Sequence, residues 1–243
     1  MRISRFYLPG DYSHDRLELP KEQCHYALTV LRLKNGFVVE IFNGEGDCAR
    51  GTIEVHGRHQ ADILITERLD TDSESPLDST LVQCISKGDR MDYSIQKCVE
   101  LGISRIQPVF SERCEVKLDG DKLQKRREQW QQIVINACEQ SGRNLVPQVM
   151  PTCTLQDYLQ SFNPTKCLGI IGDPYAQQDL KQLPNPKNGI SLLIGPEGGL
   201  SEDEVALAVN SGFQAVCLGP RVLRTETAGP ALLAISQSLW GDL

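Results

Sequence analysis

Two glycine-bearing stretches combine a bare backbone with charged side chains, and both could bind a small ligand. The first is LLIGPEGGLSEDE, residues 192–204, in which an apolar run ends at Gly195 and three glycines fall within five residues. The second is LGPRVLRTETAGP, residues 218–230, which carries two arginines, two threonines and a glutamate. A third stretch, LGIIGDP (168–174), is also an apolar run that ends in a glycine. Glycines at such places let a ligand contact backbone N–H and C=O groups directly.

The first stretch lacks the sequences that commonly bind phosphate groups. No Gly-Lys-Ser/Thr follows it, as a Walker A loop requires, and it does not match GxGxxG. Glu197 and the acids of Ser201-Glu202-Asp203-Glu204 would repel a phosphate, so an uncharged or cationic ligand suits the loop better. A single loop of this kind would be read as a tight turn. Three of them indicate one shared pocket.

The elements that position these stretches are predicted to be buried strands that alternate with helices. Apolar strands without period-2 polarity are typical of a parallel sheet that helices cover on both faces, and ligands bind at the carboxyl ends of such strands. The last helix is expected to start near Ala228, because Gly229 and Pro230 fit a first turn better than a helix interior. The predicted strands are 79–86, 104–110, 167–173, 190–195 and 215–219.

Residues 1–69 are predicted to form a small β-barrel-like module with one helix. A helical pattern runs over residues 21–36, with Cys24, Leu28 and Leu31 on one face and Gly36 as its stop. Residues 70–79 are acidic and contain serines and a proline, which predicts a linker, and residues 80–243 form the second domain. The β patterns of the first module lie at 5–9, 37–44, 49–57 and 60–69.

Composition excludes several classes of protein. The net charge of −7 argues against indiscriminate nucleic-acid binding, although residues 80–146 carry eleven bases against nine acids and are compatible with a specific RNA partner. No apolar run could span a membrane and the N-terminus lacks a signal peptide's apolar segment, so we expect a cytoplasmic protein. The nine cysteines form no CxxC pair and are expected to be reduced and mostly buried. No cysteine lies at finger spacing from His56 and His59, so no metal site is expected.

The stretches LLIGPEGGLSEDE and LGPRVLRTETA resemble the SPOUT methyltransferases, and more narrowly the ribosomal RNA small subunit methyltransferase E family. MRISRFYLP, HYALTVLRLKNG, SKGDRMDYSIQKCVELG, SERCEVKLDG and EQSGRNLVP also look like segments of that family in the same order. The resemblance implies an α/β protein: a C-terminal SPOUT domain with a deep trefoil knot, and a small N-terminal PUA-like β-barrel that binds RNA. It also implies a homodimer, S-adenosylmethionine as methyl donor, and N3 of a uridine in 16S rRNA as the acceptor, within the small ribosomal subunit.

The chemistry of the implied reaction suggests roles for three charged residues, and the resemblance implies the residues of the cofactor pocket. Arg224 is the candidate cation for the uracil oxygens, with a salt bridge to Glu226 or a neighbouring acid as the alternative. Glu226 is the candidate general base and Glu197 its rival, although a carboxylate near a helix N-terminus is also favoured by the helix dipole. The residues implied to line the cofactor pocket are Gly172, Ile194, Gly195, Gly198, Leu218, Gly219 and Leu223.

Basic side chains near the predicted barrel and the predicted site are candidates for contacts with RNA phosphates. For each of them a solvated surface charge is the alternative. His25 could stack on a base, or it could pack beside the apolar helical face. The candidates are Arg2, Arg5, His25, Arg32, Lys87, Arg90, Arg113 and Arg143.

Three other functions stay open at this point. One is an RNA-binding assembly factor that has the knot but no activity, against which the complete RTET sequence argues. Another is a nucleotide-binding enzyme of ordinary doubly wound topology, against which the missing phosphate-binding sequences argue. The third is a SPOUT methyltransferase that acts on another RNA and differs only in its substrate.

Overall fold

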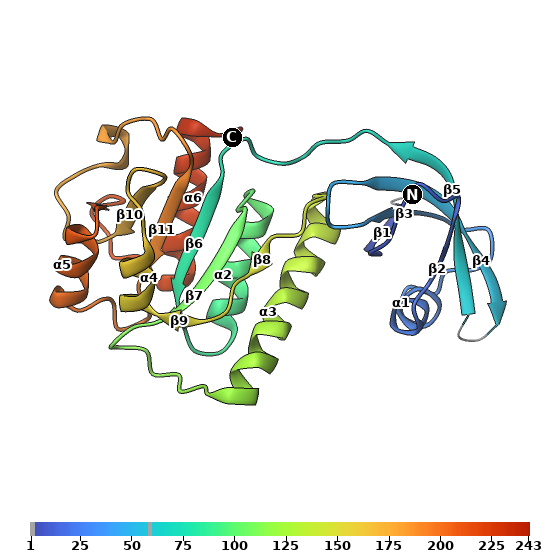
Figure 1. Cartoon of the computed structure of the whole chain (residues 1–243), viewed down its shortest axis with the longest axis horizontal. Coiled ribbons are helices and arrows are strands. Elements are labelled where there is room, and N and C mark those ends of the chain that lie inside the picture. The colour runs from blue at the N-terminus through green and yellow to red at the C-terminus, as the bar shows by residue number, and fades with distance from the viewer. Residues whose placement is uncertain (1–2, 58–59) are drawn as a thin grey trace. The chain divides into compact units, whose positions relative to one another are not determined.

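The computed structural model describes residues 3–57 and 60–243 (Figure 1). The chain forms two compact units. The first unit contains Met1–Glu74 and Cys138–Val146, and the second contains Ser75–Ala137 and Pro147–Leu243. Arg2 and His59 lie outside the described residues, so the expectations about them have no structural counterpart. The predicted boundaries at 1–69, 70–79 and 80–243 stay predictions.

The first unit is built on a five-stranded sheet in the order β1-β3-β4-β5-β2. The β1–β3 pair is parallel and the other pairs are antiparallel. The long β4–β5 hairpin alternates buried and more exposed positions, as expected for a sheet with one face on a core. The strands are β1 (Ser4–Tyr7), β2 (Arg16–Glu18), β3 (Val38–Phe42), β4 (Cys48–Gly57) and β5 (Gln60–Leu69).

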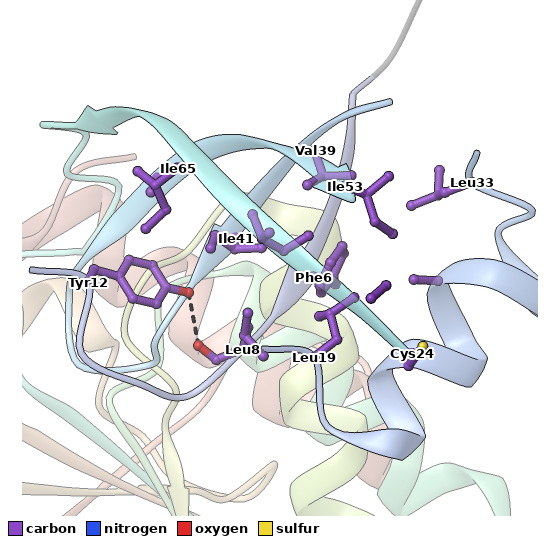
Figure 2. Close-up of a cluster of buried hydrophobic side chains, with 14 residues drawn as sticks. Phe6, Leu8, Tyr12, Leu19, Cys24, Leu33, Val39, Ile41, Ile53 and Ile65 are labelled. Carbon is purple, nitrogen blue, oxygen red and sulfur yellow. Dashed lines mark hydrogen bonds between the residues drawn. The ribbon is translucent and has the colours of Figure 1, made fainter. Parts of the chain in front are cut away.

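The core of the first unit contains side chains from most of its strands and from its helix (Figure 2). Phe6, Ile41 and Ile63 are almost completely buried in it. Tyr12 is also buried, and its hydroxyl donates a 2.9 Å hydrogen bond to the Leu8 carbonyl oxygen. Burial raises the pKa of Tyr12 far above its usual range, so this phenol acts as a neutral donor.

The helix of the first unit is shorter than predicted. It consists of α1 (Lys21–His25) and a π-helix, η1 (Tyr26–Val30), and Arg32 follows with a positive φ of 54°. The π-helical turn changes the spacing of the buried positions. Cys24 is buried as predicted, but Ala27 takes the next buried position, and Leu28 and Leu31 are only partly buried. The prediction that the helix continues to Gly36 was therefore wrong.

The second unit contains a sheet in the order β12-β10-β11-β6-β7-β8, with β9 paired to β7, and all its pairings are parallel. This confirms the parallel α/β sheet that the apolar strands predicted. The strands are β6 (Ser79–Cys84), β7 (Arg105–Phe110), β8 (Gln148–Val149), β9 (Cys153–Thr154), β10 (Leu168–Gly172), β11 (Ile190–Ile194) and β12 (Phe213–Val216). The helices are α2 (Asp89–Glu100), α3 (Gly120–Ser141), α4 (Leu155–Ser161), the 3₁₀-helix η2 (Leu180–Gln182), α5 (Glu202–Asn210) and α6 (Thr225–Trp240).

Two elements near the glycine-bearing stretches differ from their predictions. Strand β12 was expected over 215–219 but ends at Val216, because the backbone then turns to pair elsewhere and the Cys217 N–H donates to the Gln178 carbonyl. Helix α6 begins at Thr225 and not near Ala228, because the Thr227 and Ala228 N–H groups both donate to the Arg224 carbonyl. The knot that the resemblance implies stays a prediction.

Helix α6 tolerates Gly229 and Pro230 in its second turn because tertiary packing outweighs their low helix propensity. A Cβ atom at Gly229 would lie 3.3 Å from Ser94 Oγ and 3.4 Å from Leu81 Cδ1. A glycine therefore lets α6 approach both α2 and β6 closely. Helix α2 matches its prediction, with Met91, Ile95 and Cys98 fully buried.

All nine cysteines are free, and five of them are buried. Within residues 3–57 and 60–243, no group of three or more His, Cys, Asp or Glu side chains is arranged to hold a metal ion. Among the same residues, no helix combines the length and the apolar character needed to cross a membrane.

An ion pair in the first unit engages Arg143, which was predicted to contact RNA. Only 4% of Arg143 is exposed, and its Nε and Nη2 atoms donate to Glu74 Oε2 at 2.9 and 2.6 Å. The other carboxylate oxygen accepts from the backbone N–H groups of Asn144 and Leu145, both at 3.0 Å. Arg143 is thus engaged inside the first unit, and its contact with RNA stays a prediction.

Replacement of Arg143 by alanine should therefore destabilise the protein strongly. The change leaves the half-buried Glu74 carboxylate without its cation, which costs about 3 kcal/mol. Urea denaturation of wild-type and R143A protein measures the loss. Arg16→Ala is the matched control, because Arg16 pairs with Glu54 and Asp62 on the exposed face of the same unit. Equal denaturation midpoints for R143A and R16A would show that the Arg143–Glu74 pair stabilises the fold no more than the exposed pairs of Arg16 do.

Candidate functional site

The carboxyl ends of four neighbouring strands lie at the same level of the sheet in the second unit. Gly172 of β10 pairs with Val216 of β12, and Ile194 of β11 pairs with Gln83 of β6. The β10–β11 register places Ile171 beside Leu193, so these two strands also end together. The structure thus confirms that the three glycine-bearing stretches leave the sheet along one edge. A fourth segment, the loop after β6, leaves it there too.

The chain runs in opposite directions from the two central strands of this edge. After β6 it continues through α2 to β7 on one side, and after β11 it continues through α5 to β12 on the other. In open α/β sheets a crevice forms where neighbouring strands diverge in this way, and ligands bind there. The loop after β11, residues 195–200, and the loop after β6, residues 85–88, border this position.

The 195–200 loop is folded tightly onto itself. A Cβ atom at Gly195 would lie 3.0 Å from the Leu200 nitrogen, which is tighter than most Cβ contacts, so a larger residue there would push the loop open. The Gly199 N–H donates to the Pro196 carbonyl at 2.9 Å and closes a turn. Ser201 and Glu204 then form the predicted capping box, in which Ser201 Oγ accepts from the Glu204 N–H and Glu204 accepts from the Ser201 N–H.

Three other segments hold the 195–200 loop in place. Thr225 Oγ1, in the first turn of α6, donates to the Gly195 carbonyl at 2.7 Å. Arg113 Nη1 donates to the Gly198 carbonyl at 3.0 Å. Glu197 Oε1 accepts two hydrogen bonds of 2.8 Å, one from Arg90 Nη1 and one from the Lys87 backbone N–H. The loop that exposes its backbone is thus positioned by side chains of α2, α6 and the segment after β7.

Glu197 is held as a carboxylate. Its partial burial alone would raise its pKa, but the hydrogen bonds from Arg90 and from backbone N–H groups outweigh burial and lower the pKa below its ordinary value. A carboxylate with a lowered pKa and occupied lone pairs is a weak proton acceptor. The geometry therefore makes Glu197 a poor general base and gives it a positioning contact with Arg90.

Glu226 and Arg224 make fewer polar contacts than Glu197 does. Glu226 Oε1 lies 4.0 Å from Arg90 Nε, whereas its Oε2 atom is buried and has no hydrogen-bond partner among the described residues. Arg224 is the exposed residue that precedes α6, and within the described part of the chain its guanidinium makes no ion pair. The salt bridge between Arg224 and Glu226, which was the alternative to a catalytic role for Arg224, is thus not formed.

The predicted cofactor residues lie on three of the aligned loops or strand ends. A Cβ atom at Gly172 would lie 3.4 Å from Ile194 Cδ1, so these two strand ends pack directly together. The loops after β10 and β12 are joined to each other by the Cys217 N–H, which donates to the Gln178 carbonyl at 2.9 Å. Leu218 and Leu223 are half-buried in the loop before α6, and Gly219 is exposed there with a φ of 93°. Their roles toward a cofactor stay predictions.

The predicted RNA contacts fall into two groups. Arg5 resembles Arg143 in having a structural role: its guanidinium donates to the carbonyls of Cys138 and Arg143 and lies 4.0 Å from the centre of the Phe42 ring. The other described candidates reach the surface of their own unit. His25 and Arg32 are exposed on the first unit. On the second unit Lys87 pairs with Glu115, Arg90 with Glu197, and Arg113 with Gly198.

Sequence reasoning missed the buried polar groups behind the loops. Gln83 is fully buried, and its Nε2 atom donates to Thr225 Oγ1 at 3.0 Å. Ser94 of α2 donates to Gln83 Oε1, also at 3.0 Å. One signal was present: glutamine in the apolar strand sequence STLVQC is unusual, because a buried amide is costly unless it is hydrogen-bonded.

Two protein-family models match this chain. A family model described as "RNA methyltransferase domain" matches residues 73–237, and one described as "RNA methyltransferase PUA domain" matches residues 19–66. An α/β domain with backbone-exposing loops at one sheet edge, preceded by a PUA domain, is thus the architecture of an RNA methyltransferase.

Individual relatives narrow the class to one family. "Ribosomal RNA small subunit methyltransferase E" of Buchnera aphidicola is 38% identical over all of this chain and 98% of its own length. The protein of that name from Bacillus subtilis is 34% identical over 88% of this chain and 87% of its own length. The crystal structure of the Neisseria gonorrhoeae protein of that name, bound to S-adenosyl methionine, is 44% identical with a TM-score of 0.94 over 99% of both chains. The chain belongs to the ribosomal RNA small subunit methyltransferase E family.

Replacement of Arg90 by glutamine should raise the pKa of Glu197. The variant removes the cation and its hydrogen bond, while burial, which favours the protonated form, remains. In the wild type, a lowered pKa means that Glu197 stabilises the fold at pH values above the ordinary carboxyl value of 4.5, and this contribution is lost as the pH falls through the lowered pKa. A carboxyl ¹³C NMR titration of both proteins measures the shift.

Arg113→Gln is the matched control for the Arg90 variant. Arg113 contacts the same loop, but through the Gly198 carbonyl and not through Glu197. The Glu197 titration should be the same in R113Q and in the wild type. A Glu197 pKa that does not move in R90Q would mean that Arg90 does not set its ionisation.

Proposed function

We propose that this protein transfers a methyl group from S-adenosylmethionine to N3 of a specific uridine in 16S ribosomal RNA. One observation carries the proposal: a full-length relative of the same fold, 44% identical, is named for ribosomal RNA methylation and has S-adenosyl methionine bound. The general reaction class is that of the RNA methyltransferase domain that the chain contains. The uridine and its N3 atom follow from the family resemblance.

The residues at the sheet edge suit a cationic donor. S-adenosylmethionine carries a sulfonium and an ammonium group. Glu226 Oε2 is buried without a hydrogen-bond partner among the described residues, and Glu197 is held ionised beside the same loops. A buried unpaired carboxylate oxygen is stabilised by a positive charge. The donor would be held by backbone groups of the loops that contain Gly195, Gly198 and Gly219, together with Gly172, Ile194, Leu218 and Leu223.

Two side chains of the protein would have separate catalytic roles, one as proton acceptor and one as stabilising cation. When bound, S-adenosylmethionine supplies an electrophilic methyl group on its sulfonium sulfur. The N3–H group of uracil must lose its proton before or as nitrogen attacks. We assign Glu226 as the proton acceptor, because Glu197 is occupied by Arg90 and has a lowered pKa. Arg224 would stabilise the negative charge that develops on the uracil oxygens, since its guanidinium is exposed and unpaired within the described chain.

RNA binding would use the exposed basic groups of each unit. In the first unit these are His25 and Arg32, which flank the π-helix, and in the second they are Lys87, Arg90 and Arg113. Cationic side chains bind phosphates and make the affinity depend on salt. Arg2 stays a candidate that lies outside the described residues. Arg5 and Arg143 are not part of this proposal, because their guanidinium groups are engaged inside the first unit.

We also propose that the protein is a homodimer that acts in the cytoplasm on the small ribosomal subunit. Leu239 at the end of α6 and Leu243 are 40% and 63% exposed, which suits burial against a second copy. The cytoplasmic location follows from the proposed ribosomal substrate. Sedimentation analysis tests the dimer, and a monomer at micromolar concentration would contradict it.

Mass mapping of 16S rRNA tests the proposed reaction directly. In one arm, 16S rRNA from cells with and without the gene is digested and analysed by mass spectrometry. In a second arm, small subunits from cells without the gene are incubated with the purified protein and S-adenosylmethionine before their rRNA is digested. We expect one N3-methyluridine that is absent without the gene and restored by the protein. RNA binding without restored methylation would favour an assembly factor, and methylation of a different RNA would favour another substrate.

Arg224→Ala should leave binding of S-adenosylmethionine nearly unchanged but slow single-turnover methyl transfer about 100-fold, as expected for removal of one preorganised donor at a developing charge. Arg221→Ala is the matched control, because Arg221 lies exposed in the same loop three residues earlier. It should transfer the methyl group at the wild-type rate. An unchanged single-turnover rate for R224A would remove Arg224 from the mechanism.

A further inference from the structure

A chain of buried hydrogen bonds connects α2 to the 195–200 loop. Ser94 Oγ donates to Gln83 Oε1 at 3.0 Å, Gln83 Nε2 donates to Thr225 Oγ1 at 3.0 Å, and Thr225 Oγ1 donates to the Gly195 carbonyl at 2.7 Å. The side chains come from three elements, α2, β6 and α6, and at most 7% of each residue is exposed. We call Ser94, Gln83 and Thr225 the polar relay.

The polar relay has a definite direction. The Gln83 amide donates from Nε2, which also donates to the Cys84 carbonyl at 3.1 Å, and it accepts at Oε1 from Ser94. Thr225 Oγ1 accepts from Gln83, and the Gly195 carbonyl lies closer to it, at 2.7 Å, than Ser86 Oγ does, at 3.4 Å, so the hydroxyl proton of Thr225 is directed to the Gly195 carbonyl. A hydroxyl has only one proton, so reversal of any link would take this proton away from the loop.

The last acceptor of the polar relay is the peptide group between Gly195 and Pro196, at the start of the 195–200 loop. The next residue is Pro196, so this peptide has no N–H group, and its carbonyl oxygen is its only hydrogen-bonding group. Gly195 has no side chain to restrict its backbone. Pro196 is buried and packs beside this peptide, but the hydrogen bond from Thr225 is the polar contact that orients its carbonyl.

We propose that Gln83, with Ser94 behind it, is a positioning residue for cofactor binding: through Thr225 it fixes the Gly195–Pro196 peptide in the orientation that binds the methyl donor. This inference rests on the proposed function, because it concerns the donor site of that reaction. Gln83 does not touch the donor in this account. It acts by keeping the Thr225 proton on the Gly195 carbonyl.

Gln107 provides an internal comparison. It lies on the adjacent strand β7, is also buried, and its Nε2 donates to the carbonyls of Pro108 and Pro151, both at 2.9 Å. It thus resembles Gln83 in residue type, burial and hydrogen bonding to backbone. It has no contact with Thr225 or Gly195 in the described structure. Substitution at Gln107 therefore reports the general cost of losing a buried amide in this sheet.

The test compares Gln83→Leu, Gln83→Glu and Gln107→Leu by calorimetric titration with S-adenosylmethionine. Both Gln83 variants should weaken binding about tenfold, the effect of losing one buried hydrogen bond, while Gln107→Leu binds like the wild type. Gln83→Glu has the right shape and can accept from Ser94, but it cannot donate to Thr225 and would draw the Thr225 proton to itself. Wild-type binding by Gln83→Glu, or equal binding by all three variants, would overturn the proposal.

A second pair of variants tests the same link if the Gln83 variants do not fold. Thr225→Ser keeps the hydroxyl and should bind the donor within about twofold of the wild type, whereas Thr225→Val has the same shape without the hydroxyl and should bind about tenfold more weakly. At saturating donor, the turnover of Thr225→Val with RNA should recover, because the defect lies in donor binding. Equal binding by the serine and valine variants would contradict the proposal.

The outcome for the wild type separates this inference from the proposed function. If the wild type does not bind S-adenosylmethionine, the proposed function fails. If the wild type binds it and methylates small subunits while the Gln83 and Thr225 variants bind equally well, only the polar relay fails.

Discussion

The 195–200 loop depends on contacts that it cannot make for itself. Its glycines and Pro196 leave few side chains and few N–H groups to fix the backbone, and a strand end with so little of its own structure would be mobile. The fold compensates by holding the loop from outside, through Thr225 at the Gly195 carbonyl, Arg113 at the Gly198 carbonyl, and Arg90 at Glu197. The parallel sheet makes this possible, because it brings β6, β11 and the start of α6 to one edge.

Charge at this edge has two separate uses. The Arg90–Glu197 pair is internal to the site and lowers the pKa of Glu197, which is why we do not assign this carboxylate as the general base. Glu226 and Arg224 begin the same helix, yet they keep an unpaired carboxylate oxygen and an exposed guanidinium. The Arg90–Glu197 pair thus positions the loop, whereas Glu226 Oε2 and the Arg224 guanidinium are the groups that we propose act on the substrate.

Helix α6 shows how packing overrides local preference. Gly229 and Pro230 argued for a late start, but the helix begins at Thr225. The early start has a consequence for the site, because it places Thr225 and Glu226 in the first helical turn, where the hydroxyl reaches Gly195 and the carboxylate lies near Arg90. Gly229 contributes through its small size, since it lets α6 pack closely on Ser94 and Leu81.

The parallel α/β sheet, the three glycine-bearing loops at its edge and the family resemblance could all be predicted from the amino-acid sequence, because apolar periodicity and loop composition are local properties. Which charged groups are paired and which are exposed could not be predicted in this way. Arg143 and Glu74 are 69 residues apart in the chain, and Arg90 and Glu197 are 107 residues apart, so no local sequence pattern predicts these pairs. The same holds for Gln83 and Thr225, separated by 142 residues. Burial and pairing depend on which distant segments meet, and that is fixed only when the sheet and its helices pack.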